Sequence, residues 1–163
     1  MPKKIVIDGL SQENVANAIG EVRKYQAWIL EKESELRSRL ASLGATVASI
    51  QFSRAIYHGT NDVSVRVDDT GSVAVIYAEG ESVAFIEFGA GITYGYGHPL
   101  AGELGVGPGT YPEGKGHWDK PNGWWYAHGQ HTYGNPPAMA MVAARDAMVA
   151  DITRIAKEVF GSA

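Results

Sequence analysis

The 163-residue chain contains no cysteine. This absence excludes disulfide cross-links, zinc sites with thiolate ligands and catalysis by a cysteine nucleophile. It also fits a chain that folds in a reducing cytosol, where disulfides are rare. We therefore expect the stability of the protein to come from packing or from assembly with other chains.

Long apolar runs are missing too. The first eight residues contain an apolar run of only three, too short for a signal peptide, and no run elsewhere approaches membrane-spanning length. We therefore expect an intracellular protein with no membrane contact.

Clusters of positive charge are also missing. The chain has 14 basic against 18 acidic residues, and no more than two basic residues are adjacent. Because a surface that follows a phosphate backbone needs clustered positive charge, the composition predicts no specific contact with nucleic acid.

What remains is the composition of an ordinary globular domain. Apolar residues make up 45% of the chain and charged residues 20%, which is enough to bury a core. The length is close to the commonest domain size. We therefore expect residues 1–163 to form a single domain.

Residues 12–43 show the clearest periodicity. It predicts one amphipathic helix, about 45–50 Å long, with Ser11 as its N-cap and Gly44 as its C-cap. Such a helix is longer than a domain of this size is wide, so we expect part of it to project or to meet a neighbour. A coiled coil is the alternative, although Gln26 and Glu33 interrupt its seam. The apolar residues of the pattern are Val15, Ile19, Val22, Ile29, Leu36, Leu40 and Leu43.

The other elements predict an α+β fold. Residues 4–7 and 46–57 each suggest a strand, and residues 63–67 and 72–78 suggest a hairpin. A short helix is expected over residues 81–88, and a C-terminal helix over residues 138–160, stopped by Gly161. The long N-terminal helix and the C-terminal helix would then pack on a small antiparallel β-sheet.

Residues 89–134 stand apart from these elements. They hold 13 of the 20 glycines, eight of the 16 aromatic residues and four of the five histidines, but only five charges. Disordered linkers are poor in aromatic residues, so we predict an extended loop insertion that becomes ordered by docking. Its candidate interface anchors are Tyr94, Tyr96, Trp118, Trp124, Trp125, Tyr126 and Tyr133.

Two other roles for the loop aromatic residues remain open. The rings of Trp118, Trp124, Trp125 and Tyr126 could fold back as a small satellite core under the loop. They could also form a sugar-stacking platform, as in a carbohydrate-binding module.

The loop histidines raise the alternative of a metal-dependent hydrolase. The candidate ligands are His98, His117, Asp119, His128 and His131. The closest pair, His128 and His131, lies in a glycine-flanked segment without the His-Glu-x-x-His arrangement that couples ligands to a general base. We therefore expect neither a metal nor another cofactor.

Glu87 is the only charge in an apolar run at the entrance to the loop. No second carboxylate and no Ser/His partner stands in a recognisable relation to it, so no catalytic residue is predicted. We expect its carboxylate to accept hydrogen bonds from loop backbone amides. Glu87, Phe88, Gly89 and Gly91 would then shape the loop entrance.

Two segments carry a family resemblance. Residues 85–94 read Phe-Ile-Glu-Phe-Gly-Ala-Gly-Ile-Thr-Tyr, and residues 134–141 read Gly-Asn-Pro-Pro-Ala-Met-Ala-Met before the last helix. With the opening strand and the long first helix, the chain resembles the small neck proteins of long-tailed bacteriophages, described as head–tail connector, tail-completion or minor capsid proteins. It departs from that pattern at Ala90, where threonine is common, and in its longer, tryptophan-rich loop.

The resemblance implies a structural virion protein without catalysis. It implies an α+β subunit that assembles into a homo-oligomeric ring, expected to be hexameric, between the DNA-filled head and the tail tube. Its partners would be the adjoining connector, stopper or tail-tube proteins. It would be located in the neck or tail of the virion, after assembly in the bacterial cytoplasm.

Overall fold

The computed structural model describes residues 11–91, 93–94, 97–105 and 121–161. A long helix, α1 (Gln12–Arg54), is followed by a hairpin of β1 (Ser64–Asp68) and β2 (Val75–Glu79) and by the short helix α2 (Val83–Phe88). The later elements are α3 (Ala101–Leu104), the strands β3 (Trp124–Trp125) and β4 (His131–Thr132), and the helix α4 (Ala140–Gly161). The α+β class is confirmed, and the strand expected over residues 4–7 lies outside the described residues.

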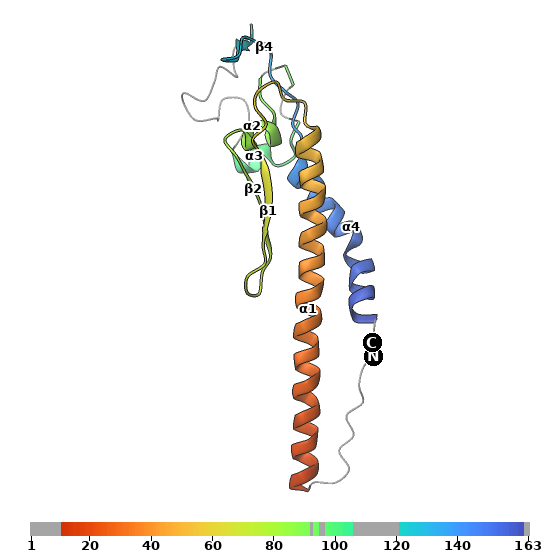
Figure 1. Ribbon diagram of the computed structural model, residues 1–163. Coiled ribbons are helices and arrows are strands. Elements are labelled where there is room, and N and C mark those ends of the chain that lie inside the picture. Colours follow the sequence, from red (N-terminus) through yellow and green to blue (C-terminus); the bar gives the residue numbers. More distant parts are fainter. Residues whose placement is uncertain (1–10, 92, 95–96, 106–120, 162–163) are drawn as a thin grey trace.

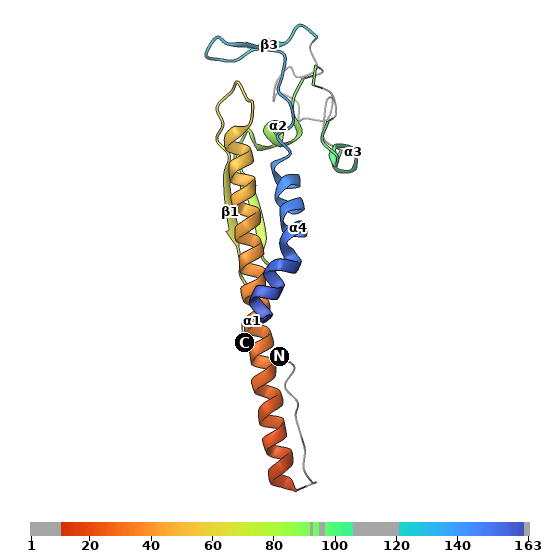
Figure 2. The same cartoon turned by 90° about the vertical axis from the view of Figure 1, so that its right-hand side faces the viewer.

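The molecule is elongated along α1 (Figure 1). The hairpin β1–β2 and helix α4 lie against the C-terminal part of α1, and the N-terminal part extends beyond both (Figure 2). The β3–β4 hairpin lies at the opposite end of the molecule from the start of α1. No helix in the described ranges is long and apolar enough to cross a membrane.

Helix α1 is longer than predicted. Ser11 caps it as expected, because its hydroxyl accepts a hydrogen bond from the amide of Asn14 at 3.2 Å. The helix does not end at Gly44 but continues to Arg54, so the strand predicted over residues 46–57 is wrong. At 43 residues, α1 is about 65 Å long.

Packing explains why α1 continues. Its buried residues, Ala41, Gly44, Ala48 and Phe52, recur every three or four positions and form one face. A Cβ added at Gly44 would lie 2.6 Å from Cδ1 of Ile76 and 2.8 Å from Sδ of Met148. Gly44 therefore permits close packing inside the helix, where the sequence suggested a cap.

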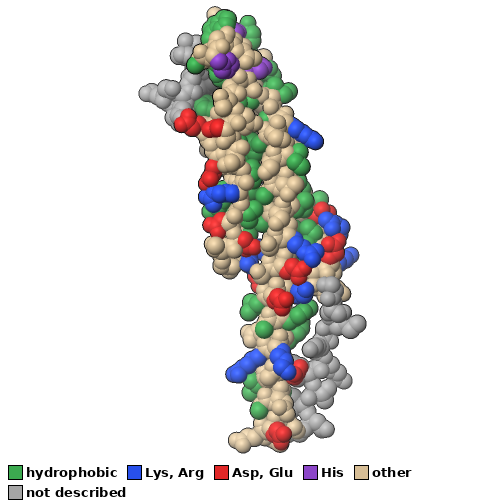
Figure 3. All heavy atoms as spheres, viewed as in Figure 1, with side chains coloured by type: hydrophobic (Ala, Val, Ile, Leu, Met, Phe, Trp, Pro, Cys, Tyr) green, Lys and Arg blue, Asp and Glu red, His purple; other side chains and the backbone are tan. Residues whose placement is uncertain are grey.

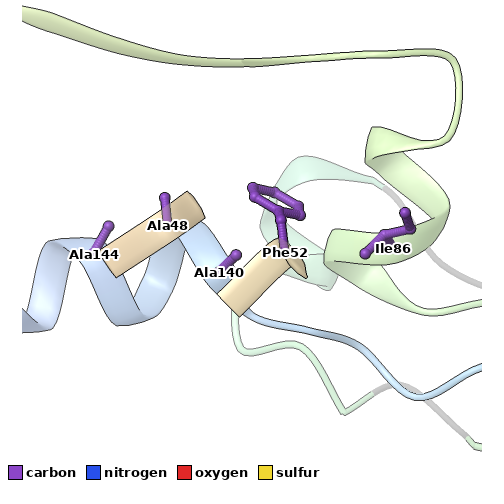
Figure 4. Close-up of a cluster of buried hydrophobic side chains, with 5 residues drawn as sticks. All are labelled: Ala48, Phe52, Ile86, Ala140 and Ala144. Carbon is purple, nitrogen blue, oxygen red and sulfur yellow. The ribbon is translucent and has the colours of Figure 1, made fainter. Parts of the chain in front are cut away.

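Helix α4 runs antiparallel to α1 and forms the core with it. Small residues from both helices, with Phe52 and Ile86, make the buried cluster in Figure 4. At the other end of α4, the ring of Phe160 contacts that of Trp28 edge to face, with centroids 5.9 Å apart. Helix α4 thus covers α1 from Phe52 to Trp28. The cluster consists of Ala48, Phe52, Ile86, Ala140 and Ala144.

The β1–β2 hairpin is confirmed. Its register pairs Ser64 with Glu79 and Asp68 with Val75 in an antiparallel ladder. An ion pair of 2.8 Å between Arg37 and Asp69 ties the end of this hairpin to α1. The described strands form two separate two-stranded sheets, β1–β2 and β3–β4, instead of one larger sheet.

The short helix α2 is also confirmed. The Asp62 carboxylate accepts hydrogen bonds from the amides of Ser82, at 3.0 Å, and Glu81, at 2.6 Å, just before the helix begins. These bonds hold the pKa of Asp62 below its usual range. Gly89 ends the helix with φ 79°, a conformation that favours glycine.

The two glycines inside α1 give the first testable prediction. Gly20→Ala should raise the free energy of unfolding by about 1 kcal/mol, because alanine is the better helix former and a Cβ there meets open space. At Gly44 the gain in helix propensity is offset by a loss of packing, because the side chains of Ile76 and Met148 must move to admit the Cβ. We expect no net stabilisation from Gly44→Ala in urea unfolding. Equal stabilisation by both variants would contradict the packing described at Gly44.

Candidate assembly site

The two ends of the long loop are joined by backbone hydrogen bonds. The amide of Ala90 donates to the carbonyl of Asn135 at 3.0 Å, and the amide of Asn135 donates to the carbonyl of Ala90 at 2.9 Å. Together they form an isolated antiparallel bridge. The loop is therefore an insertion closed at its base.

Two glycines make this bridge possible. Gly91 has φ 85° and Gly134 has φ 114°, both in the region that favours glycine. A Cβ on Gly91 would overlap the carbonyl oxygen of Tyr133, and a Cβ on Gly134 would overlap that of Ala90. The two backbone segments thus lie too close together for side chains at these positions.

The buried carboxylate of Glu87 joins α2 to the start of α4. Its Oε2 accepts the amide of Ala140 at 2.7 Å, and its Oε1 accepts the amide of Met141 at 3.1 Å. These are the first amides of α4, whose first turn contains no acidic residue. Because a helix N-terminus carries partial positive charge, the carboxylate acts as an N-cap supplied by a different helix.

His98 completes this cap. Its Nδ1 accepts the amide of Leu100 at 3.1 Å, which assigns the proton to Nε2, and Nε2 donates to Oε1 of Glu87 at 3.1 Å. The imidazole is buried and packs on Phe88, with ring centroids 4.3 Å apart. Both ring nitrogens of this candidate metal ligand are therefore engaged in structural hydrogen bonds.

Asn135 is the third polar residue of this region and is also buried. Its Nδ2 donates to the carbonyl of Phe85 at 2.8 Å and to that of Pro136 at 3.2 Å. The side chain thus ties the end of the loop to α2. We name Glu87, Phe88, Gly89, Gly91, His98, Gly134 and Asn135 the loop-base cluster.

The sequence identified only part of the loop-base cluster. Glu87, Phe88, Gly89 and Gly91 were expected at the loop entrance, and they lie there. Glu87 was expected to accept amides of the loop, but it accepts those of Ala140 and Met141 in α4. This cap was not expected, because Ala140 is 53 positions further along the chain. His98 was considered only as a metal ligand and Asn135 only as part of the resemblance segment, residues 134–141. The one available signal was that α4 begins without an acidic residue of its own.

Beyond its base, the loop forms a small hairpin. Trp124 pairs with Thr132, and Trp125 pairs with His131. The hairpin is held to the body by a 3.2 Å hydrogen bond between Oγ1 of Thr132 and Nδ1 of His58. Thr132 is buried, so one side of the hairpin faces the protein.

The hairpin divides the predicted anchors into two groups. Trp124 and Tyr126 are half-buried, and Tyr126 contacts the ring of Tyr57 edge to face at 6.1 Å. Burial raises the pKa of the Tyr126 phenol well above its usual value. Trp125 and Tyr133, by contrast, are 70% and 55% exposed. Trp124 and Tyr126 thus pack against the protein as a satellite core would, whereas the rings of Trp125 and Tyr133 lie on the surface.

The remaining predicted anchors can be placed only in part. Tyr94 is 44% exposed, close in sequence to the loop base. Tyr96 and Trp118 lie outside the described residues.

The described histidines do not assemble a metal site. The ring of His128 stacks on that of Tyr126, and Nε2 of His131 donates to the carbonyl of Asn122 at 3.0 Å. Within the described ranges, no group of three His, Asp or Glu residues could hold a metal ion. His117 and Asp119, two of the candidate ligands, lie outside those ranges.

An apolar cavity of about 320 Å³ opens beside the loop base. Its walls come from α1, α2, α3 and α4 and include Phe52, Phe88 and Leu104. Glu87 and His98 also line it, and they bond to each other. The cavity therefore offers mainly apolar surface.

Comparison with known protein families, with curated proteins and with solved structures found no match for this chain.

Proposed function

We propose that this protein is a structural subunit of the bacteriophage neck. In this role it forms a homo-oligomeric ring, expected to be hexameric, that joins the head to the tail or completes the tail. It performs no catalysis. Its partners are the adjoining connector, stopper or tail-tube proteins, and it resides in the virion.

The observation that carries this proposal is the meeting of the two segments on which the resemblance rests. Residues 85–94 and residues 134–141 are far apart in sequence, yet the Ala90–Asn135 bridge and the Glu87 cap join them. Their polar groups bind backbone amides and carbonyls, which is a scaffolding role. These segments thus serve as the platform from which the loop extends.

The surface beyond this platform supports contact with other subunits. Trp125 and Tyr133 extend from a hairpin that is fixed at its inner side by Thr132. Tryptophan and tyrosine are the residues that most often anchor protein interfaces, because they supply large contact areas with few rotatable bonds. We infer that these two rings contact a neighbouring subunit or the adjoining ring.

Removing both anchors tests this role. In the double variant Trp125→Ser, Tyr133→Ser we expect the concentration needed for half-assembly to rise by at least about tenfold, because interface anchors contribute 2 kcal/mol or more. Analytical ultracentrifugation would measure this concentration. The matched control is Val149→Ser, which alters an equally exposed side chain, 68%, on α4. If the double variant assembled like the wild type, the hairpin would not be an assembly surface.

A further inference from the structure

The N-terminal part of α1 projects from the body without cover from α4 or the β1–β2 hairpin (Figures 1 and 2). Helix α4 reaches Trp28 through its Phe160, and the β1–β2 hairpin reaches Arg37 through Asp69. Residues 12–27 lie beyond both contacts. In a single copy, the first four turns of α1 and part of a fifth therefore do not pack on the core.

An apolar stripe runs along this projecting part and ends at Ile29, just past its limit. Val15, Ile19, Val22 and Ile29 recur at spacings of three, four and seven and are 39%, 47%, 48% and 37% exposed. Hydrophobic side chains are visible along this part of the helix in Figure 3. We call these four residues the α1 stripe.

The flanks of the α1 stripe are almost free of charge. By helical periodicity, one flank holds Ala18 and Tyr25 and the other holds Ala16 and Leu30. Arg23 is the one charged residue within this arc of residues 12–30. The acidic and basic residues of this part lie on the opposite face, where Lys24 pairs with Glu21 at 2.9 Å.

Gln26 indicates what covers the α1 stripe. It lies between Val22 and Ile29 on the same face, at a position where a coiled coil would place an apolar residue. A carboxamide both donates and accepts hydrogen bonds, so it is complementary to a second carboxamide. Parallel copies in register bring Gln26 against Gln26, whereas an antiparallel pairing sets it against aliphatic side chains.

We propose that the α1 stripe packs, in parallel and in register, against the α1 stripe of a neighbouring copy of this chain. The nearly uncharged flanks allow identical helices to approach without repulsion between like charges. Parallel packing also places the bodies of neighbouring subunits at the same end of the paired helices, as a closed ring requires. Glu33 sets the limit of the contact, because two carboxylates facing each other there would repel.

This inference rests on the proposed function, because a stripe of about two heptads is too short to associate strongly alone. Subunit contacts elsewhere in the ring would hold neighbouring helices at a high effective concentration. The helix contact then adds to an assembly that the β3–β4 hairpin also supports.

The absence of cysteine makes a direct test possible. In Val22→Cys the introduced thiol is unique, and a short bis-maleimide should link neighbouring copies into covalent dimers and higher species on a denaturing gel. The matched control is Lys24→Cys, an exposed position on the opposite face of the same turn. Circular dichroism checks that both variants fold, and native mass spectrometry records their assembly.

Each outcome decides between the two proposals. Cross-linking at position 22 but not at position 24 supports the α1 contact, even if the assembly is a dimer and not a ring. Assembly without cross-linking at position 22, or with equal cross-linking at both positions, overturns the α1 contact and leaves the proposed ring intact. A chain that neither assembles nor cross-links, alone or after tail-tube or connector proteins are added, overturns both.

Discussion

Replacing Gly134 with alanine should lower the free energy of unfolding by about 3 kcal/mol. The φ of 114° places a side chain in a strained conformation, which costs about 1–2 kcal/mol. The new Cβ would also overlap the carbonyl oxygen of Ala90. That oxygen belongs to the backbone and cannot rotate away, so the two hydrogen bonds between Ala90 and Asn135 must break. Urea unfolding followed by circular dichroism would measure the loss.

Gly129→Ala separates the two causes. Gly129 also has a positive φ, 84°, but a Cβ there meets open space in the turn of the β3–β4 hairpin. We therefore expect Gly129→Ala to lower the free energy of unfolding by only about 1 kcal/mol, because it introduces backbone strain without steric overlap. If Gly134→Ala lost no more stability than Gly129→Ala, the close approach at the loop base would not be a stabilising feature of the protein.

The second large effect is expected at Glu87. Glu87→Ala should destabilise the protein by about 3–5 kcal/mol, because it leaves the amide of Ala140 and Nε2 of His98 without their acceptor in a buried site. The start of α4 should fray at the same time. Hydrogen exchange of the Ala140 and Met141 amides, measured by NMR, would report this local opening.

Glu87→Gln is the matched control for this site. Glutamine preserves the size of the side chain and one acceptor oxygen, but it removes the negative charge that favours a helix N-terminus. We expect a loss of stability smaller than for alanine, with the Ala140 amide still protected from exchange. Equal losses for both variants would show that the charge matters and the hydrogen-bond geometry does not. No loss in either would refute the capping role.

The parts of the fold predicted correctly are those with strong local signals. The β1–β2 hairpin follows from alternating valines around a turn sequence, and α2 follows from an apolar run that ends in Gly89. The error at residues 46–57 has a tertiary cause. This segment alternates apolar and polar residues in part, but Ala48 and Phe52 pack on α4 and α2, and that burial outweighs local preference.

The candidate site shows the same division. Glu87, Gly89 and Gly91 could be selected from the sequence, because a lone charge in an apolar run and the glycines that follow it are local features. The partners of Glu87 could not, because His98 lies just before α3, Ala140 and Met141 lie at the start of α4, and all three meet Glu87 only after folding. Likewise, no pattern distinguishes the half-buried Trp124 from the exposed Trp125, since their contrasting exposure depends on which side of a two-residue strand faces the body.

The claim that this chain is a ring-forming structural subunit is tested most directly by its mass under native conditions, combined with electron microscopy of the same sample. We predict a closed ring with one defined subunit number, six by the expectation stated above, or a monomer that forms such a ring when tail-tube or connector proteins are added. A chain that remains monomeric at high concentration and joins neither kind of partner would contradict the account.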